Sequence, residues 1–219
     1  MDSPGLEPHR HRRALRSLAR INRLSLAGRR LWSVVRGIHT RRGGPVTVLD
    51  VACGGGDVAL SLKRLADQAG CPVKVNACDI SPVAVEFAQQ RARSLGLEVE
   101  FFEHDALMGA IPGTFDLVSS SLFLHHLSEE EAVAFLGMCA GAGPRTFHQD
   151  LLRTPLGYAL AKITVPFITR SRVVRVDGVR SVEGAFTLPE AKDLADRAGL
   201  RDAEISRCWP ERFSLYWTR

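Results

Sequence analysis

The chain has 219 residues, of which 45% are hydrophobic and 24% charged, and this balance predicts one soluble domain with a proper core. No apolar stretch reaches membrane-spanning length, and neither an H-E-x-x-H motif nor a ladder of Cys and His residues suggests a metal site. The five cysteines form no C-x-x-C pair and follow no secretory signal peptide, so we expect buried thiols in a reducing, cytoplasmic compartment.

The net charge of +5 is concentrated near the N-terminus. Residues 9–42 contain eleven arginines and no acidic residue, whereas residues 43–219 contain eighteen basic and twenty-two acidic residues. Apolar residues recur at helical spacing from Leu15 to Leu24 and again from Leu31 to Ile38, with Gly28 interrupting the pattern. Residues 1–42 are therefore predicted to form a basic helical arm, which either packs on the body or serves as a transit peptide.

The rest of the chain is organised around a glycine turn. The apolar run Val46–Val51 predicts a buried strand, Gly54, Gly55 and Gly56 follow, and the periodic segment Val58–Leu65 predicts a helix. Glycine permits left-handed backbone and close approach of a ligand, and the amides that begin a helix favour an anionic or polar group. Nucleotide-containing cofactors of more than one kind bind at such a turn. The spacing Gly54-x-Gly56-x-x-Ala59 also satisfies the fingerprint of dinucleotide-binding proteins, and an ordinary tight turn without a ligand is a further alternative.

Two acidic residues accompany this turn. Asp50 lies inside the strand before it, and Asp79 ends the second predicted strand, Val73–Ile80. Ser81 and Pro82 then suit the N-cap and first position of a helix that runs to Leu95. A carboxylate at this strand end can accept hydrogen bonds from both hydroxyls of a ribose. The same position is compatible with a carboxylate that only stabilises the N-terminus of the helix, but we favour the ribose role.

Strands and helices alternate along the remaining chain. An apolar helix is expected over 155–169, broken or kinked at Pro166, then an arginine cluster over 170–180 and a helix from Thr187 to Gly199. The predicted fold is α/β, a Rossmann-like seven-stranded, mostly parallel sheet with helices on both faces and a C-terminal antiparallel hairpin. Its strands are expected at 46–51, 73–80, 99–102, 115–121, 145–152, 203–208 and 212–218.

The run Val48–Asp57 resembles the first motif of the class I S-adenosylmethionine (SAM)-dependent methyltransferases, hydrophobic-x-D-x-G/A-C/x-G-x-G. The resemblance covers 46–219 and implies that residues 43–219 form a methyltransferase domain that binds SAM, with the arm 1–42 as a lid. It implies that Asp79 binds the ribose, that Asp105 meets the adenine amino group, and that the backbone of Ala106 contacts the ring. The implied cofactor residues are Asp50, Ala52, Gly54, Gly56, Asp79, Ile80, Asp105, Ala106 and Ser121.

A second pattern, F-D-x-V-x-x-x-x-x-L-H-H-L from Phe115 to Leu127, resembles small-molecule methyltransferases. The N-P-P-Y and D-P-P-Y motifs of base-modifying relatives are absent, which argues against a nucleic-acid acceptor. His125 and His126 are the candidate general bases, with His126 expected to be the inward ring. His148 and Asp150 are outer candidates. In the alternative interpretation, one ring of the pair packs under the loop and the other lies on the surface.

Two further stretches, Asp150–Tyr158 and Asp177–Thr187, resemble bacterial methyltransferases encoded beside type III polyketide synthases. This likeness implies O- or C-methylation of a phenolic, polyketide or quinone-like acceptor, in a pocket walled by an apolar insertion over 153–187. The first alternative is an NAD(P)-dependent oxidoreductase, which leaves Asp50, Asp105 and the loop with His125 and His126 without a role. The others are an RNA or protein methyltransferase that uses the basic arm, and a SAM-binding protein without catalysis.

Overall fold

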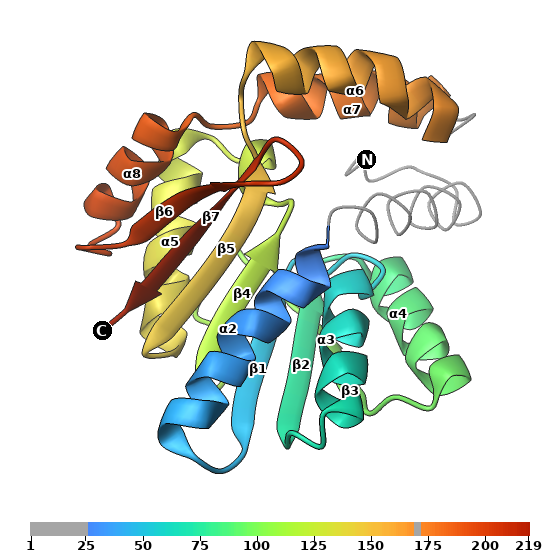
Figure 1. Cartoon of the computed structure of the whole chain (residues 1–219), viewed down its shortest axis with the longest axis vertical. Coiled ribbons are helices and arrows are strands. Elements are labelled where there is room, and N and C mark those ends of the chain that lie inside the picture. The colour runs from blue at the N-terminus through green and yellow to red at the C-terminus, as the bar shows by residue number, and fades with distance from the viewer. Residues whose placement is uncertain (1–25, 169–171) are drawn as a thin grey trace.

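The computed structural model describes residues 26–168 and 172–219, and these form one seven-stranded sheet in the order β3-β2-β1-β4-β5-β7-β6 (Figure 1). The first five strands are parallel, and β7 runs antiparallel to both β5 and β6. The predicted fold class is therefore confirmed. The strands are β1 (Val46–Val51), β2 (Val73–Asp79), β3 (Val99–Glu103), β4 (Leu117–Ser121), β5 (Arg145–Leu151), β6 (Glu204–Cys208) and β7 (Arg212–Thr218).

Helices cover both faces of the sheet (Figure 1). One apolar cluster joins α2, α3 and α4 to one face, and a second joins α5 and α8 to the other. None of the described helices is long and apolar enough to span a bilayer. The helices are α2 (Ala27–Arg42), α3 (Asp57–Gln68), α4 (Pro82–Leu95), the 3-10 turn η1 (Leu124–His126), α5 (Glu129–Ala142), α6 (Pro155–Ile168), α7 (Arg172–Glu183) and α8 (Leu188–Arg197).

Helix ends follow the capping residues visible in the sequence. The Ser81 hydroxyl accepts a hydrogen bond from the Ala84 amide, and Gly96 ends α4 in the left-handed conformation. Ser128 is the N-cap of α5 and Thr187 is the N-cap of α8, and each forms a reciprocal capping box. These local signals fix where each helix starts at the edge of the sheet.

Helix α2 is part of the body rather than a detached arm. Leu31, Val35 and Ile38 are buried against the same cluster as α3 and β1. The expected interruption at Gly28 is wrong, because Gly28 lies inside α2, where a Cβ atom would come within 2.3 Å of the Ser61 hydroxyl. Glycine there permits α2 and α3 to pack closely. Residues 1–25, including the predicted helix from Leu15 to Leu24, lie outside the described residues, and the lid stays a prediction.

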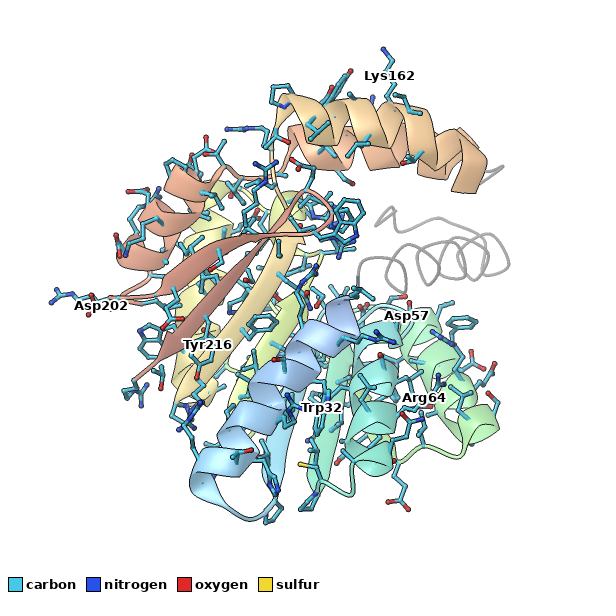
Figure 2. The ribbon with its side chains drawn as sticks, in the orientation of Figure 1. Trp32, Asp57, Arg64, Lys162, Asp202 and Tyr216 are labelled. Atoms are coloured by element: carbon cyan, nitrogen blue, oxygen red, sulfur yellow. The ribbon has the colours of Figure 1, made fainter. Side chains whose placement is uncertain are left out.

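The insertion after β5 forms two helices, α6 and α7, that lie on the carboxyl side of the sheet (Figure 1). Helix α6 continues through Pro166 to Ile168, so it is not broken there, and the alternative expectation of a kink at Pro166 stays a prediction. Helix α7 was not expected, because its charged residues obscure the helical period. Lys162 points away from the sheet on the outer side of α6 (Figure 2).

Candidate active site

The glycine turn between β1 and α3 is shaped by left-handed backbone. Ala52, Gly54 and Gly56 have φ angles of 55°, 53° and 72°. A Cβ atom on Gly56 would lie 2.8 Å from the Phe101 ring, so the position tolerates no side chain. Ala52 occupies a left-handed position that costs an L-residue about 1–2 kcal/mol. The turn thus holds its backbone in a conformation that the strand and the neighbouring side chains impose.

Asp79 connects the end of β2 to this turn. One carboxylate oxygen accepts a hydrogen bond from the Gly54 amide at 2.7 Å, and the other accepts one from the Ser81 amide at 2.9 Å. The side chain is partly exposed at the carboxyl edge of the sheet. The next residue, Ile80, is 65% exposed, although isoleucine side chains are usually buried.

Asp105 and Ala106 follow β3 at the same edge of the sheet. The Asp105 carboxylate accepts a hydrogen bond from the Leu107 amide at 2.9 Å, which holds the loop in a tight turn. Ala106 is buried. The residues predicted to hold a ribose and an adenine therefore lie at the carboxyl ends of adjacent strands, β2 and β3.

Asp50 is buried under the turn, with 1% of its surface exposed. The Ser119 hydroxyl donates to its carboxylate at 3.2 Å. Burial, with the nearby charges of Asp57 and Asp79, raises the pKa of Asp50 to about 7. Asp57 begins α3 beside this edge (Figure 2). Three carboxylates thus make the turn electronegative.

Arg91, on α4, supports the turn from outside. Its guanidinium donates to the Gly55 carbonyl and to the Asp57 carboxylate, both at 2.6 Å, and it lies over the Phe87 ring. Arg91 was not among the residues predicted from the sequence. The available signal was the i, i+4 spacing of Phe87 and Arg91, which places both on one face of the predicted helix.

Ser121, at the end of β4, is tied to Gln149 on β5. The Gln149 side-chain amide donates to the Ser121 hydroxyl at 3.0 Å and to the Ala27 carbonyl at 3.1 Å. The first turn of α2 is therefore anchored at the carboxyl edge of the sheet, where open α/β folds bind their ligands.

His125, in the η1 turn that follows β4, pairs with Asp150 on β5. Its Nδ1 lies 2.6 Å from one carboxylate oxygen, and its backbone amide donates to the other at 3.2 Å. The His125 side chain is 5% exposed and Asp150 is 1% exposed. Although burial alone would raise the pKa of Asp150, the contact with His125 and two backbone amides keeps it below its usual value.

His126 is exposed, with its ring centroid 4.0 Å from that of His125. The expectation that His126 is the inward ring is therefore wrong. The two rings of η1 lie in contact at an interplanar angle of 40°, and Asp150 holds the first of them. The alternative interpretation, with one ring packed and the other at the surface, describes the geometry better.

His148 is a structural residue. It is fully buried, hydrogen-bonded through Nδ1 to the Ser120 hydroxyl at 2.8 Å, and packed on the edge of the Phe135 ring. Burial disfavours the charged ring and lowers the pKa of His148 to about 3. A ring held neutral inside the core takes no part in proton transfer at the cleft.

The family model of the methyltransferase domain matches residues 48–142. The chain is 33% identical over 128 residues to the ubiquinone biosynthesis O-methyltransferase of Xanthomonas euvesicatoria pv. vesicatoria (strain 85-10). This match covers 56% of the chain and 50% of that relative, so the chain spans about half the length of the curated relatives it matches.

Two solved structures have the same fold. A SAM-dependent methyltransferase from Aquifex aeolicus superimposes with a TM-score of 0.63 at 20% identity, over 97% of this chain and 98% of that one. The plantazolicin methyltransferase BamL superimposes with a TM-score of 0.65 at 17% identity, over 87% of this chain and 70% of that one. Residues 48–142 thus match a methyltransferase domain, and the described residues have the fold of these two methyltransferases.

Proposed function

We propose that the chain transfers the methyl group of SAM to a small-molecule acceptor that is phenolic, polyketide or quinone-like, on oxygen or carbon, in the cytoplasm. The matched domain and the relative named as a ubiquinone biosynthesis O-methyltransferase support this proposal. Because the match covers only half of that relative, the acceptor is assigned by chemical class alone.

The observation that carries the proposal is the charge of the glycine turn. Asp50, Asp57 and Asp79 surround it, and the fields of the last two help to raise the pKa of the first. Arg91 balances one of these charges by its contact with Asp57. The remaining negative charge would repel the pyrophosphate of a dinucleotide, whereas it would attract a cationic ligand. The turn thus favours a sulfonium cofactor over a dinucleotide.

The described residues fit SAM. The backbone at Gly54 and Gly56 carries no side chain that would block a ligand, and the partly exposed Asp79 carboxylate at the end of β2 would accept hydrogen bonds from a ribose. The exposed Ile80 would lie against the adenine, and the loop of Asp105 and Ala106 would border its edge. SAM, when bound, supplies an activated methyl group on a positively charged sulfur.

We assign the general-base role to His125. Asp150 accepts a hydrogen bond from Nδ1–H, which fixes the tautomer and leaves the lone pair on Nε2. Such a ring can take the proton of an acceptor hydroxyl during attack, whereas a carbon acceptor or an ionised phenol needs only positioning. The buried Asp150 carboxylate would stabilise the imidazolium that forms.

Helices α6 and α7 are proposed as a wall of the acceptor pocket. The end of α7 packs directly against η1, because a Cβ atom on Gly184 would come within 2.8 Å of the His125 carbonyl. Leu156, Tyr158 and Ile163 on α6 are exposed apolar side chains, suited to an aromatic or polyketide acceptor.

The test begins with ligand binding. Calorimetry should show that the protein binds SAM and its demethylated product, S-adenosylhomocysteine (SAH), but not NAD or NADP. Tighter binding of either dinucleotide would overturn the assignment. Turnover is then measured with methyl-labelled SAM against a panel of phenols, quinols and polyketides, with purified RNA and protein as controls for the alternative acceptors.

A further inference from the structure

Arg212, the first residue of β7, is a buried cation without a complete set of partners. Only 1% of its surface is exposed, and no described residue accepts a hydrogen bond from its Nη1. The arginines Arg42 and Arg91 instead contact Asp116 and Asp57. Burying a guanidinium is costly unless its donors are satisfied, so a protein retains one in this state for a reason.

Its position is at the ligand edge of the sheet. Arg212 pairs with Leu151 across β5 and β7, next to the last residues of β5. Side chains alternate along a strand, so Leu151 shares a face with Gln149, and Arg212 lies on that face too. The Gln149 side-chain oxygen is likewise buried without a hydrogen bond from any described residue.

The local charge at this corner is positive. Arg30 on α2 donates to the Trp209 carbonyl in the turn before β7, and Arg30 and Arg212 influence each other electrostatically. The Asp150 carboxylate acts on Arg212 through its charge, but no hydrogen bond joins the two side chains, and Asp150 instead accepts from the ring and the amide of His125. An arriving anion would find an excess of positive charge and an unused donor.

We propose that Arg212 binds a carboxylate of a ligand at the carboxyl edge of the sheet. Two ligands supply that group: SAM through its methionyl end, or an acceptor that carries a carboxylate. The identity of the ligand rests on the proposed function. The proposal that a carboxylate binds here rests only on the burial and the unpaired donor of Arg212. β7 is three strands from β1, about 14 Å away, which favours the acceptor as the source.

The experiment uses matched ligand pairs on the full chain. SAH is compared with methylthioadenosine, which keeps the nucleoside and sulfur but lacks the carboxylate. Benzoate is compared with benzamide, both on the free protein and on the protein saturated with SAH. Each pair is titrated against wild type, Arg212→Gln, Arg212→Lys and the control Arg207→Gln. Arg207 is an exposed arginine of the same hairpin that pairs with Glu211.

Two results support the proposal and identify the source. If Arg212→Gln weakens SAH by about tenfold or more and leaves methylthioadenosine unchanged, the site holds the SAM carboxylate. If wild type prefers benzoate to benzamide and Arg212→Gln loses this preference with SAH affinity intact, the site holds the acceptor. Arg212→Lys should retain part of the effect, because it keeps the charge without the planar pair of donors. It replaces the glutamine variant if that variant does not fold.

If neither pair responds to the Arg212 variants, or if Arg207→Gln produces the same changes, the proposal is wrong. Failure of wild type to bind SAH would overturn the proposed function instead. The benzoate comparison on the free protein would still decide whether Arg212 is an anion site.

Discussion

The affinity for SAH should fall as the pH drops through 7, because burial and two neighbouring carboxylates raise the pKa of Asp50 to about 7. A methionyl ammonium bound near the turn favours the ionised form, so in the complex the pKa of Asp50 falls back toward the ordinary carboxyl range. Binding below pH 7 must therefore release a proton from Asp50. Affinity is full above pH 7 and falls about tenfold by pH 6 and about 100-fold by pH 5, or about 2.7 kcal/mol.

Calorimetry between pH 5 and 8 measures this dependence directly. Repeating the titration at pH 6 in buffers of different ionisation enthalpy counts the proton released on binding. The control is Asp50→Asn, whose amide oxygen can still accept from the Ser119 hydroxyl but does not titrate. Circular dichroism at pH 5 verifies that the protein is folded there. A wild-type affinity that does not vary with pH, or an equal slope in Asp50→Asn, would refute the electrostatic account of the turn.

Three other predictions concern single residues. Asp79→Ala should weaken SAM binding by about 2–4 kcal/mol in calorimetry, through loss of charge-assisted bonds to the ribose, and an unchanged affinity contradicts the ribose role. For a hydroxyl acceptor, His125→Ala should lower kcat by about 10²–10⁴-fold with SAH affinity unchanged, whereas His126→Ala should not; the reverse order contradicts the assignment. His148, whose pKa is lowered to about 3, binds a proton in the unfolded state below about pH 6.5 but not in the folded state, so it removes stability as the pH falls. His148→Gln should make the acid loss of unfolding free energy shallower by up to about 1.4 kcal/mol per pH unit in urea titrations, and equal slopes contradict this.

The parts of the fold that follow local rules were predictable from the sequence. Ser81 caps the start of α4, Gly96 ends it, and Thr187 caps the start of α8. These ends are predictable because capping depends on residues within one turn of the helix. Asp50 was placed correctly inside β1 and Asp79 at the end of β2, because a buried strand followed by a turn fixes its own carboxyl end. Residues whose position depends on such local geometry can thus be named from the amino-acid sequence alone.

Features that depend on distant contacts were not predictable. Gly28 looked like a helix break, but its position opposite Ser61 makes it a packing residue. Arg91 bonds to a turn 34 residues away from it in sequence, counted to Asp57. Arg212 looked like an ordinary first residue of an edge hairpin, and only the pairing of β7 with β5 buries it. In each case the role of the residue is determined by a contact partner that is distant in the sequence, and the residue type alone does not reveal it.

The choice between His125 and His126 shows the same limit at the centre of the chemistry. The two are adjacent, identical in type and equally close to the end of β4, so the sequence offers no local reason to prefer either. Asp150 decides between them from 25 residues away, because its carboxylate receives both the ring and the backbone amide of His125. A buried carboxylate held on one side of η1 can orient one ring only. The catalytic assignment therefore follows from the position of Asp150 on β5, which makes Asp150 a positioning residue for the proposed base.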